Sequence, residues 1–330
     1  MLSRTANNLY WMSRHIERAE NTARMLDVTY RMSLLPYRTP DESWAEPWAL
    51  PLVITGLATA YYRQNPETLS SDSVLRFMVL DPANPSSIFS CLQAARESAR
   101  AVRGAITSEM YEDINSTWLE MRNRSYASIS ATGMSGFFDW VKMRSHQFRG
   151  VTVGTMVRDE GYRFIRLGTF IERADNTARI LDVKYHTLLP SVADVGGAVD
   201  YYQWGALLRS VSAFDSYRKI YRDAITPIRV MELLVLRDDI PRSLHVCMNE
   251  IYEILSDLCE DHSLEPERLA GELHAQLHYG RAEQIVNLGL HEYLMSFLGK
   301  LSAINDEINR HFLAPVYSPQ QSQSQTAAAG

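Results

Sequence analysis

The chain has 330 residues, 46% of them hydrophobic, which is enough to bury a substantial core and excludes disorder for most of its length. Its formal charge of −6 at pH 7 argues against a general nucleic-acid binder, because such a protein usually carries a basic surface that neutralises phosphates. We expect no signal peptide, because its succession of charged, apolar and small residues is not seen, and no apolar run comes near the roughly 18 residues of a membrane span. We therefore expect a cytoplasmic protein that uses neither nucleic acid nor membrane as a partner.

Helical spacing of apolar residues recurs along the whole chain, whereas alternating β-branched segments bounded by turn residues are almost absent. This pattern predicts an all-α fold. Asn84 before Pro85 and Asp239 close to Pro241 are predicted N-caps, since a short polar residue ahead of a first-turn proline favours a helix start. Helices are predicted, to within a few residues at each end, at 3–33, 47–63, 67–80, 86–104, 108–123, 134–150, 158–188, 201–222, 227–237, 241–259, 264–279 and 281–312.

Two parts of the chain repeat each other. Twelve of the sixteen residues at 15–30 recur at 170–185, where ordinary composition would give about one match by chance. The segment at 77–93 then aligns with 233–249 at nearly the same offset. The sequence therefore predicts a helical bundle of two tandem pseudo-symmetric repeats, with a first half at 1–155, a second half at 156–314 and a disordered tail at 315–330.

The repeated segment has the apolar spacing of a long helix with one buried face. Small residues stand in the middle of that face, at Ala19 and Ala23 in the first copy and at Ala174 and Ala178 in the second. Because alanines leave room for a close neighbour, we expect the two copies to pack against each other as a helix pair.

The same helix carries a polar face that both copies share. Its candidate site residues are Glu17, Arg18, Asn21, Arg24, Glu172, Arg173, Asn176 and Arg179. Ion pairs between residues four apart on one helix stabilise it by only a few tenths of a kcal/mol each. Such pairs therefore do not explain why both copies carry the same polar residues.

Two interpretations of the polar face remain open. In the first, Glu17 and Arg18 form ion pairs with Arg179 and Glu172, which would fix how the halves dock while adding little net stability. In the second, the face lines a pocket for a carboxylate, phosphate or amine ligand. There Glu17 and Glu172 would be acid/base or amine-binding groups, and Arg24 and Arg179 would bind the anion. No catalytic residue can be named from either interpretation, so enzymatic activity stays open.

The residues at 2–28 and 156–185 together resemble the alpha-E family, a predicted α-helical domain named for its Glu-Arg motif. The resemblance extends over essentially 1–313, and the Glu-Arg pairs match Glu17–Arg18 and Glu172–Arg173. The RDEGYRF segment of the family matches the chain as well, which gives the secondary site candidates Arg158, Asp159, Glu160 and Arg163.

The resemblance implies a functional context more than a chemistry. Members of this family are typically encoded or fused with circularly permuted ATP-grasp proteins that resemble amide-forming ligases. Transglutaminase-like proteins and sometimes a proteasome-like subunit are further partners of the family. The expected function is therefore a helical accessory or co-catalytic subunit of an ATP-grasp ligase-like protein in peptide synthesis or modification. The alternative is a stand-alone helical enzyme or ligand-binding protein with a Glu/Arg pocket.

Motifs for cofactors and metals are weak. The chain contains neither GxGxxG nor GxxxxGK[ST], so we expect no cofactor in this chain, and ATP and magnesium would be bound by a partner. His274 and His278 lie four residues apart on a predicted helix and could share a metal, but the sequence is not HExxH and offers no obvious third ligand. We therefore predict no metal site, with these two histidines as weak candidates.

Basic residues exceed acidic residues between 140 and 179. This excess indicates either a solvated, internally paired face or a surface for an anionic partner. The cysteines Cys91, Cys247 and Cys259 lack CxxC spacing and are expected to be buried free thiols.

Overall fold

The computed structural model describes residues 1–33, 48–65, 69–187, 198–259 and 264–314. Every regular element within these residues is a helix, as predicted. The α-helices are α1 (Ser3–Ser33), α2 (Ala49–Ile54), α3 (Ala58–Gln64), α4 (Ser71–Val79), α5 (Ile88–Ala101), α6 (Ser108–Arg122), α7 (Tyr126–Thr132), α8 (Met134–Thr155), α9 (Glu160–Thr187), α10 (Ala198–Ser210), α11 (Phe214–Tyr221), α12 (Pro227–Met231), α13 (Leu244–Leu258), α14 (Glu265–His278), α15 (Ala282–Leu288) and α16 (Leu290–Ile308). A short 3₁₀-helix, η1 (Arg103–Ala105), and two π-helices, η3 (Glu232–Leu236) and η4 (Asn309–Leu313), complete the set.

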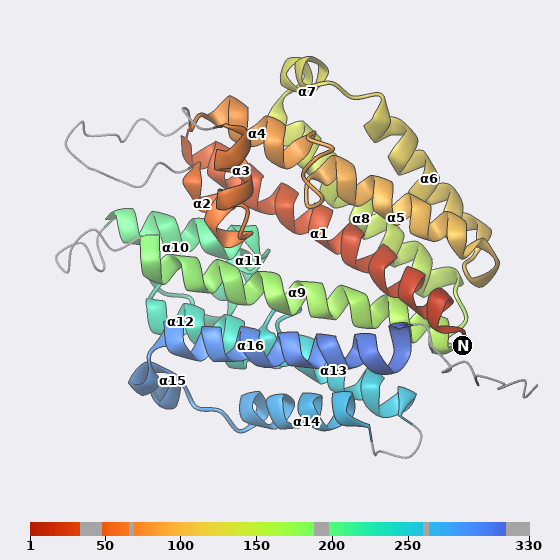
Figure 1. Ribbon diagram of the computed structural model, residues 1–330. Coiled ribbons are helices and arrows are strands. Elements are labelled where there is room, and N and C mark those ends of the chain that lie inside the picture. The colour runs from red at the N-terminus through yellow and green to blue at the C-terminus, as the bar shows by residue number, and fades with distance from the viewer. Residues whose placement is uncertain (34–47, 66–68, 188–197, 260–263, 315–330) are drawn as a thin grey trace, which may run out of the picture.

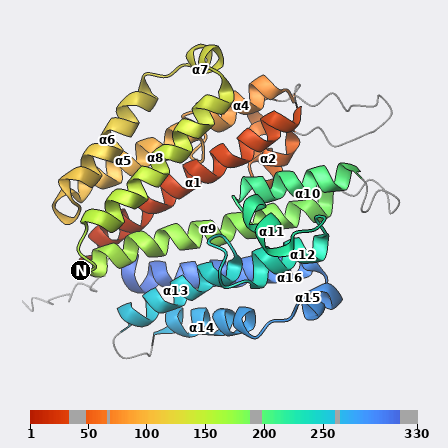
Figure 2. The same cartoon turned by 180° about the vertical axis from the view of Figure 1, so that it is seen from behind.

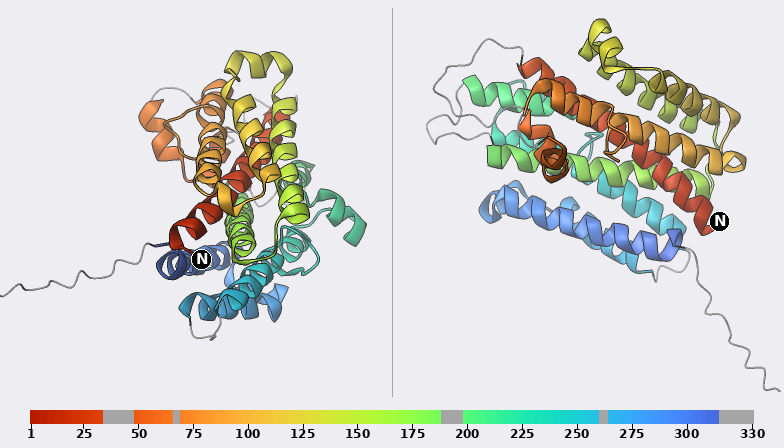
Figure 3. Two further views of the ribbon diagram at one scale, coloured as in Figure 1. Left: turned by 90° about the vertical axis from the view of Figure 1, so that its right-hand side faces the viewer. Right: turned by 45° about the horizontal axis from the view of Figure 1, so that its top comes forward.

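The two long helices α1 and α9 run side by side through the middle of the molecule (Figures 1 and 2). Helices α5 and α8 pack on α1, and α13 and α16 pack on α9, so the two central helices lie between two outer groups (Figure 3). The N-terminal amine lies 2.7 Å from Glu160 at the start of α9, which places the beginnings of both central helices at the same end. No helix in the described part of the chain is long and apolar enough to cross a membrane.

The two central helices approach each other closely at a glycine of α9. A Cβ at Gly168 would lie 2.3 Å from the carbonyl oxygen of Tyr10 and 2.4 Å from Oγ of Ser13, so only glycine allows this approach. The predicted pairing of the two repeated helices is confirmed, and the alanines of both copies are buried in the same core. Gly168 itself was not part of the prediction, which placed the close approach at the alanines.

Several predicted helices are divided by turns. The helix predicted at 47–63 is interrupted by Gly56, with a φ of +69°, and the one predicted at 281–312 is interrupted by Gly289, with a φ of +99°. A third break, at Ser212, has a φ of +56° and separates α10 from α11. Apolar spacing continues across each break, so periodicity alone does not reveal a single residue with positive φ. Helix α7 was not predicted, and the predicted tail at 315–330 lies outside the described residues.

The predicted caps at Asn84 and Asp239 are wrong. The N-caps are Ser87 and Ser243, whose hydroxyls accept from the backbone N–H three residues later. Each serine also donates to a carbonyl six residues earlier, at 2.8 Å and 2.6 Å respectively. Both prolines therefore lie in the turn ahead of the helix rather than in its first turn, and Asn84 is used to bind the backbone oxygen of Phe77.

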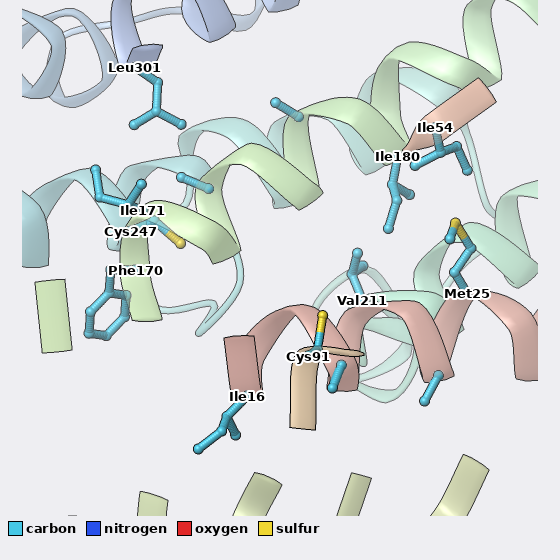
Figure 4. Close-up of a cluster of buried hydrophobic side chains, with 14 of the residues drawn as sticks. Ile16, Met25, Ile54, Cys91, Phe170, Ile171, Ile180, Val211, Cys247 and Leu301 are labelled. Atoms are coloured by element: carbon cyan, nitrogen blue, oxygen red, sulfur yellow. The ribbon is translucent and has the colours of Figure 1, made fainter. Parts of the chain in front are cut away.

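One hydrophobic cluster extends through both halves of the chain. It includes Cys91, beside α1, and Cys247, beside Ile171 of α9 (Figure 4). Burial raises the pKa of each thiol to about 12, so both are protonated at neutral pH. Cys91 and Cys247 are buried free thiols, as expected, and Cys259 is buried as well.

A small cavity of about 20 Å³ lies between α1, α5, α6 and α8. Asp113 lines it among mainly apolar side chains, and its Oδ1 has no hydrogen-bond partner among the described residues. Burial raises the pKa of Asp113 to about 6, against an opposing effect of Arg144. The carboxyl is therefore charged at neutral pH in a site that disfavours its charge.

We expect Asp113→Asn to stabilise the protein at pH 7.5 and to have little effect at pH 4. A raised folded pKa favours folding below the unfolded value of 3.8, and this contribution is lost as pH rises through about 6. An amide does not ionise, so the substitution removes this pH dependence. The free energy of unfolding at pH 7.5 should rise by about 1 kcal/mol, the lower end of the roughly 1–3 kcal/mol that a buried unsatisfied group costs. Urea unfolding at both pH values checks this, and an equal effect at both would contradict it.

Candidate functional site

The Glu-Arg pairs of the two central helices bind each other reciprocally. Arg173 of α9 donates to both carboxylate oxygens of Glu17, at 3.0 and 3.1 Å. Arg18 of α1 donates to both oxygens of Glu172, at 2.5 and 2.8 Å. Each pair is a two-bond fork between planar groups, the strongest geometry for an arginine and a carboxylate. The two motifs thus tie α1 to α9.

Glu17 lies in the larger of two carboxylate centres, together with Glu20. Arg149 of α8 contacts Glu17 at 2.9 Å and Glu20 at 2.5 Å. Arg242, two residues before the first residue of α13, contacts the same two carboxylates at 3.0 and 2.8 Å. Ser145 donates to Glu20 at 2.6 Å. The centre therefore gathers side chains from α1, α8, α9 and the start of α13.

Glu172 forms the second centre on the other side of the helix pair. Besides Arg18, it accepts from Nε of Arg14 at 2.9 Å. Arg14 also donates to Asn305 of α16 at 2.9 Å, and the hydroxyl of Tyr10 donates to the same amide oxygen at 2.7 Å. This centre connects α1, α9 and α16.

All three carboxylates are buried and ionised. Burial alone would raise the pKa of Glu172, but Arg18 and Arg14 outweigh it and bring the pKa to about 2. Burial likewise opposes ionisation of Glu17 and Glu20, and the surrounding arginines hold both pKa values below their ordinary range. Groups held ionised in this way do not exchange protons near neutral pH, so the centres are unsuited to general acid/base chemistry.

The predicted contacts across the two helices are partly correct. The pairing of Arg18 with Glu172 is confirmed, whereas the pairing of Glu17 with Arg179 is wrong. Arg179 is exposed and binds Asp175 on its own helix at 2.8 Å, because its position on α9 points away from α1. The predicted anion-binding pair of Arg24 and Arg179 therefore does not form a common site.

The remaining motif residues differ between the two copies. Asn21 accepts a hydrogen bond from Arg242 at 2.9 Å and is buried, while its counterpart Asn176 is partly exposed. Arg24 binds Glu20 at 2.7 Å and Ser212 at 2.5 Å. The polar face is thus more deeply buried in the first copy than in the second.

The secondary candidates lie at the end of the bundle, away from the carboxylate centres. Arg158 is exposed, and Asp159 accepts from the backbone N–H of Tyr162 as the chain enters α9. Glu160 binds the N-terminal amine, and Arg163 binds Asp257 of α13 at 3.1 Å. Asp159, Glu160 and Arg163 thus make contacts at the beginning of α9.

Sequence reasoning missed the supporting arginines. Arg14, Arg149 and Arg242 were not candidates, although each binds a buried carboxylate directly. Arg14 stands two residues before Ile16, the first residue of the repeated identity. Arg149 and Arg242 lie outside the repeated helix, where nothing in the local pattern separates them from surface arginines. Only the folded arrangement brings them to the motif.

The basic residues between 140 and 179 are mostly paired. Their partners are acidic residues on several helices, with contacts Lys142–Asp27, Arg144–Glu120, Arg149–Glu17, Arg163–Asp257, Arg166–Glu250, Arg173–Glu17 and Arg179–Asp175. The excess in that segment is therefore largely compensated by acids elsewhere, in agreement with the interpretation of an internally paired face.

His274 and His278 have a third histidine beside them. One ring nitrogen of each of these residues and of His245 lies within 4.8 Å of the other two. His245 is 29 positions before His274 in the sequence and belongs to α13, so helix spacing could not indicate it.

Comparison with known proteins identifies a family that is described by the same Glu-Arg motif. The model of the Alpha-E family, described as a predicted alpha-helical domain with a conserved ER motif, matches residues 1–313. Uncharacterized proteins of Mycobacterium bovis and Mycobacterium tuberculosis are each 24% identical to the chain over 326 residues. The match covers 91% of this chain but 35% of each relative, so the chain spans about a third of the length of these curated relatives. No solved structure matches the chain.

The family model covers nearly the whole described bundle, including both central helices. Its Glu-Arg motif corresponds in this chain to pairs that join those two helices. The chain belongs to the Alpha-E family.

Proposed function

We propose that this chain is a helical accessory or co-catalytic subunit of an ATP-grasp amide-ligase-like protein, acting in peptide synthesis or modification. That partner would bind ATP and magnesium. The observation that carries the proposal is that the matched relatives contain this domain as about a third of a longer chain. A domain that recurs within a longer protein is expected to act together with what accompanies it. Transglutaminase-like and proteasome-like proteins are further proposed partners.

The state of the motif supports a structural role for it within such a subunit. The carboxylates of Glu17, Glu20 and Glu172 are buried and bound by arginines of the same chain. A motif that binds itself leaves the outer surface for partner recognition. Buried ion pairs of this kind fix the arrangement of packed helices more than they add stability.

We also propose that the bundle consists of two pseudo-symmetric repeats, divided after residue 155. Ser87 and Ser243 cap corresponding helices with the same pair of hydrogen bonds. Gly133 and Gly289, with φ values of +95° and +99°, begin α8 and α16. These likenesses support a duplicated unit whose two central helices pair through their motifs.

An apolar surface at the N-terminal end is the contact that we propose for the partner. Leu2 is 77% exposed and Val157 is 76% exposed, and Met1 and Val153 are also exposed at this end. Exposed apolar residues that gather in one place are typical of interaction surfaces. The start of α1, the end of α8 and the start of α9 meet there (Figure 1).

Co-expression with an ATP-grasp ligase-like partner tests the function. We expect one complex on size-exclusion chromatography and faster ligase-dependent ATP turnover when this chain is present. Val157→Asp should abolish the complex, whereas Val286→Asp, at a residue of α15 that is also exposed, should leave it intact. Absence of any complex with unchanged turnover would contradict the function. A complex insensitive to Val157→Asp would contradict only the proposed surface.

The alternative function, binding of an anionic ligand, is favoured by one observation. The two centres contain six arginines for three glutamates, which leaves an excess of positive charge. Arg24 and Arg149 lie at the outer edge, where their guanidinium nitrogens are 3.2 and 3.0 Å from Nε2 and Nδ1 of His146. A neutral imidazole can accept a hydrogen bond at only one of these two nitrogens. Phosphate should then raise the melting temperature by mass action, and Arg24→Gln should remove the effect. No phosphate effect on the unchanged chain would exclude this alternative.

A further inference from the structure

The histidine cluster on α13 and α14 has the arrangement of ligands around a metal ion. The ring centres of His245, His274 and His278 form a triangle with sides of 5.5, 5.6 and 6.0 Å. Tetrahedral coordination with metal–nitrogen bonds of about 2.0–2.1 Å would place three imidazole centres about 5 Å apart. Small side-chain rotations would therefore bring all three nitrogens to one ion.

The ring of His245 is held in the tautomer that a ligand bound through Nε2 needs. Its Nδ1 lies 2.8 Å from the carbonyl oxygen of Leu236, the last residue of the π-helix η3. A carbonyl can only accept, so Nδ1 carries a hydrogen, and in the neutral ring this leaves the lone pair on Nε2. A backbone oxygen that fixes the ring in this way is the usual outer support of a metal-binding histidine.

His274 contributes a second, independent sign. Its Nε2 is buried and has no hydrogen-bond partner among the described residues. A buried polar atom without a partner is unusual and costs free energy unless something else binds it. The ring is fixed by Tyr252, which stacks on it with centres 5.2 Å apart and planes at 10°.

The first half of the chain has apolar aromatic residues at the positions that correspond to His245 and His274. Phe89 aligns with His245, and it packs edge-on against Trp118, with ring centres 5.0 Å apart. Trp118 precedes His274 by the same interval as Phe89 precedes His245. An apolar aromatic pair thus fills the corresponding place, so packing does not account for the histidines.

We propose that His245, His274 and His278 form a site for a divalent transition metal ion, with zinc as the principal candidate. Neutral imidazoles are ligands for zinc, copper, nickel and cobalt, and they disfavour magnesium and calcium, which prefer oxygen ligands. His245 is buried and His278 is exposed, so the fourth position faces solvent and takes water or an anion. Three protein ligands with an open position are typical of zinc sites that bind or activate a small molecule.

Calorimetric titration of the chelator-treated, full-length chain with Zn²⁺ tests the proposal. We expect one ion per chain, and with Co²⁺ the intense visible absorption of a tetrahedral site. Loss of an outer support typically weakens metal binding about 10–100-fold, so removing a direct ligand in His278→Ala should weaken it by about 100-fold or more. His278 is exposed, so this variant should keep its fold, which circular dichroism would verify.

Two further variants separate the site from other histidines. His245→Phe introduces the residue type that Phe89 has at the corresponding position of the first half. It should abolish Zn²⁺ binding without loss of packing. His311→Ala, at a histidine of η4 outside the cluster, should bind like the unchanged chain. Absence of stoichiometric binding by the unchanged chain would overturn the proposal, and so would a His278→Ala variant with undiminished affinity.

Discussion

Glu17→Ala should destabilise the protein by about 3–5 kcal/mol, the cost of leaving a buried charge without its partner. Glu17 is 1% exposed and is bound by Arg173, Arg149 and Arg242. Arg149 and Arg242 keep contacts to Glu20, but Arg173 would lose its only carboxylate contact among the described residues. A buried guanidinium between α1 and α9 would then lack a counterion.

Urea unfolding measures this effect, and Asp175→Ala is the matched control. Asp175 lies on the corresponding polar face of α9, but its pair with Arg179 is partly exposed. Exposed pairs of this kind contribute about 0–1 kcal/mol, so the control should unfold almost like the unchanged protein. Equal stability of both variants would mean that the Glu17 contacts do not hold the helices together.

Gly168→Ala should also be strongly destabilising, because the new methyl group would meet backbone rather than a movable side chain. Its Cβ would lie 2.3 Å from the carbonyl oxygen of Tyr10, closer than atoms can approach. Helices α1 and α9 would have to separate and disturb the reciprocal ion pairs nearby. Overpacking of a core typically costs about 1–3 kcal/mol, and contact with backbone places this case at or above the upper end.

Gly150→Ala is the control for that substitution. Gly150 lies within α8, and a Cβ there would meet nothing within 4 Å. Alanine favours a helix interior over glycine by about 1 kcal/mol, so this variant should be slightly more stable than the unchanged protein. Calorimetry gives the melting temperature of both variants, so the same added methyl group is compared at a tightly packed site and at a site with free space. A Gly168→Ala variant as stable as Gly150→Ala would contradict the close approach.

The long central helices could be predicted because their signals are local. Apolar residues at helical spacing predicted 3–33 and 158–188, close to the observed α1 and α9. The recurrence of Glu-Arg in both copies also indicated that the polar face mattered beyond solubility. Pairing of Arg18 with Glu172 followed from the expectation that the two copies pack together.

Other features depend on contacts between distant parts of the chain. Arg242 reaches Glu17 and Glu20 only because α13 packs on α9, and no pattern near residue 242 reveals this. The same holds for His245, which joins His274 and His278 through the packing of α13 on α14. The predicted pairing of Glu17 with Arg179 is wrong for a related reason. A polar row on one helix does not show how far the partner helix is rotated about its own axis.

A double-mutant cycle between Arg18 and Glu172 tests most directly whether the Glu-Arg motif joins the two central helices. Arg18→Gln, Glu172→Gln and the double variant keep side-chain size while removing charge, and urea unfolding gives each free energy. Since the residues bind across α1 and α9 at 2.5 Å, we predict a coupling energy of about 1–3 kcal/mol. Effects that add to within about 0.5 kcal/mol would contradict the account, because independent sites behave in that way.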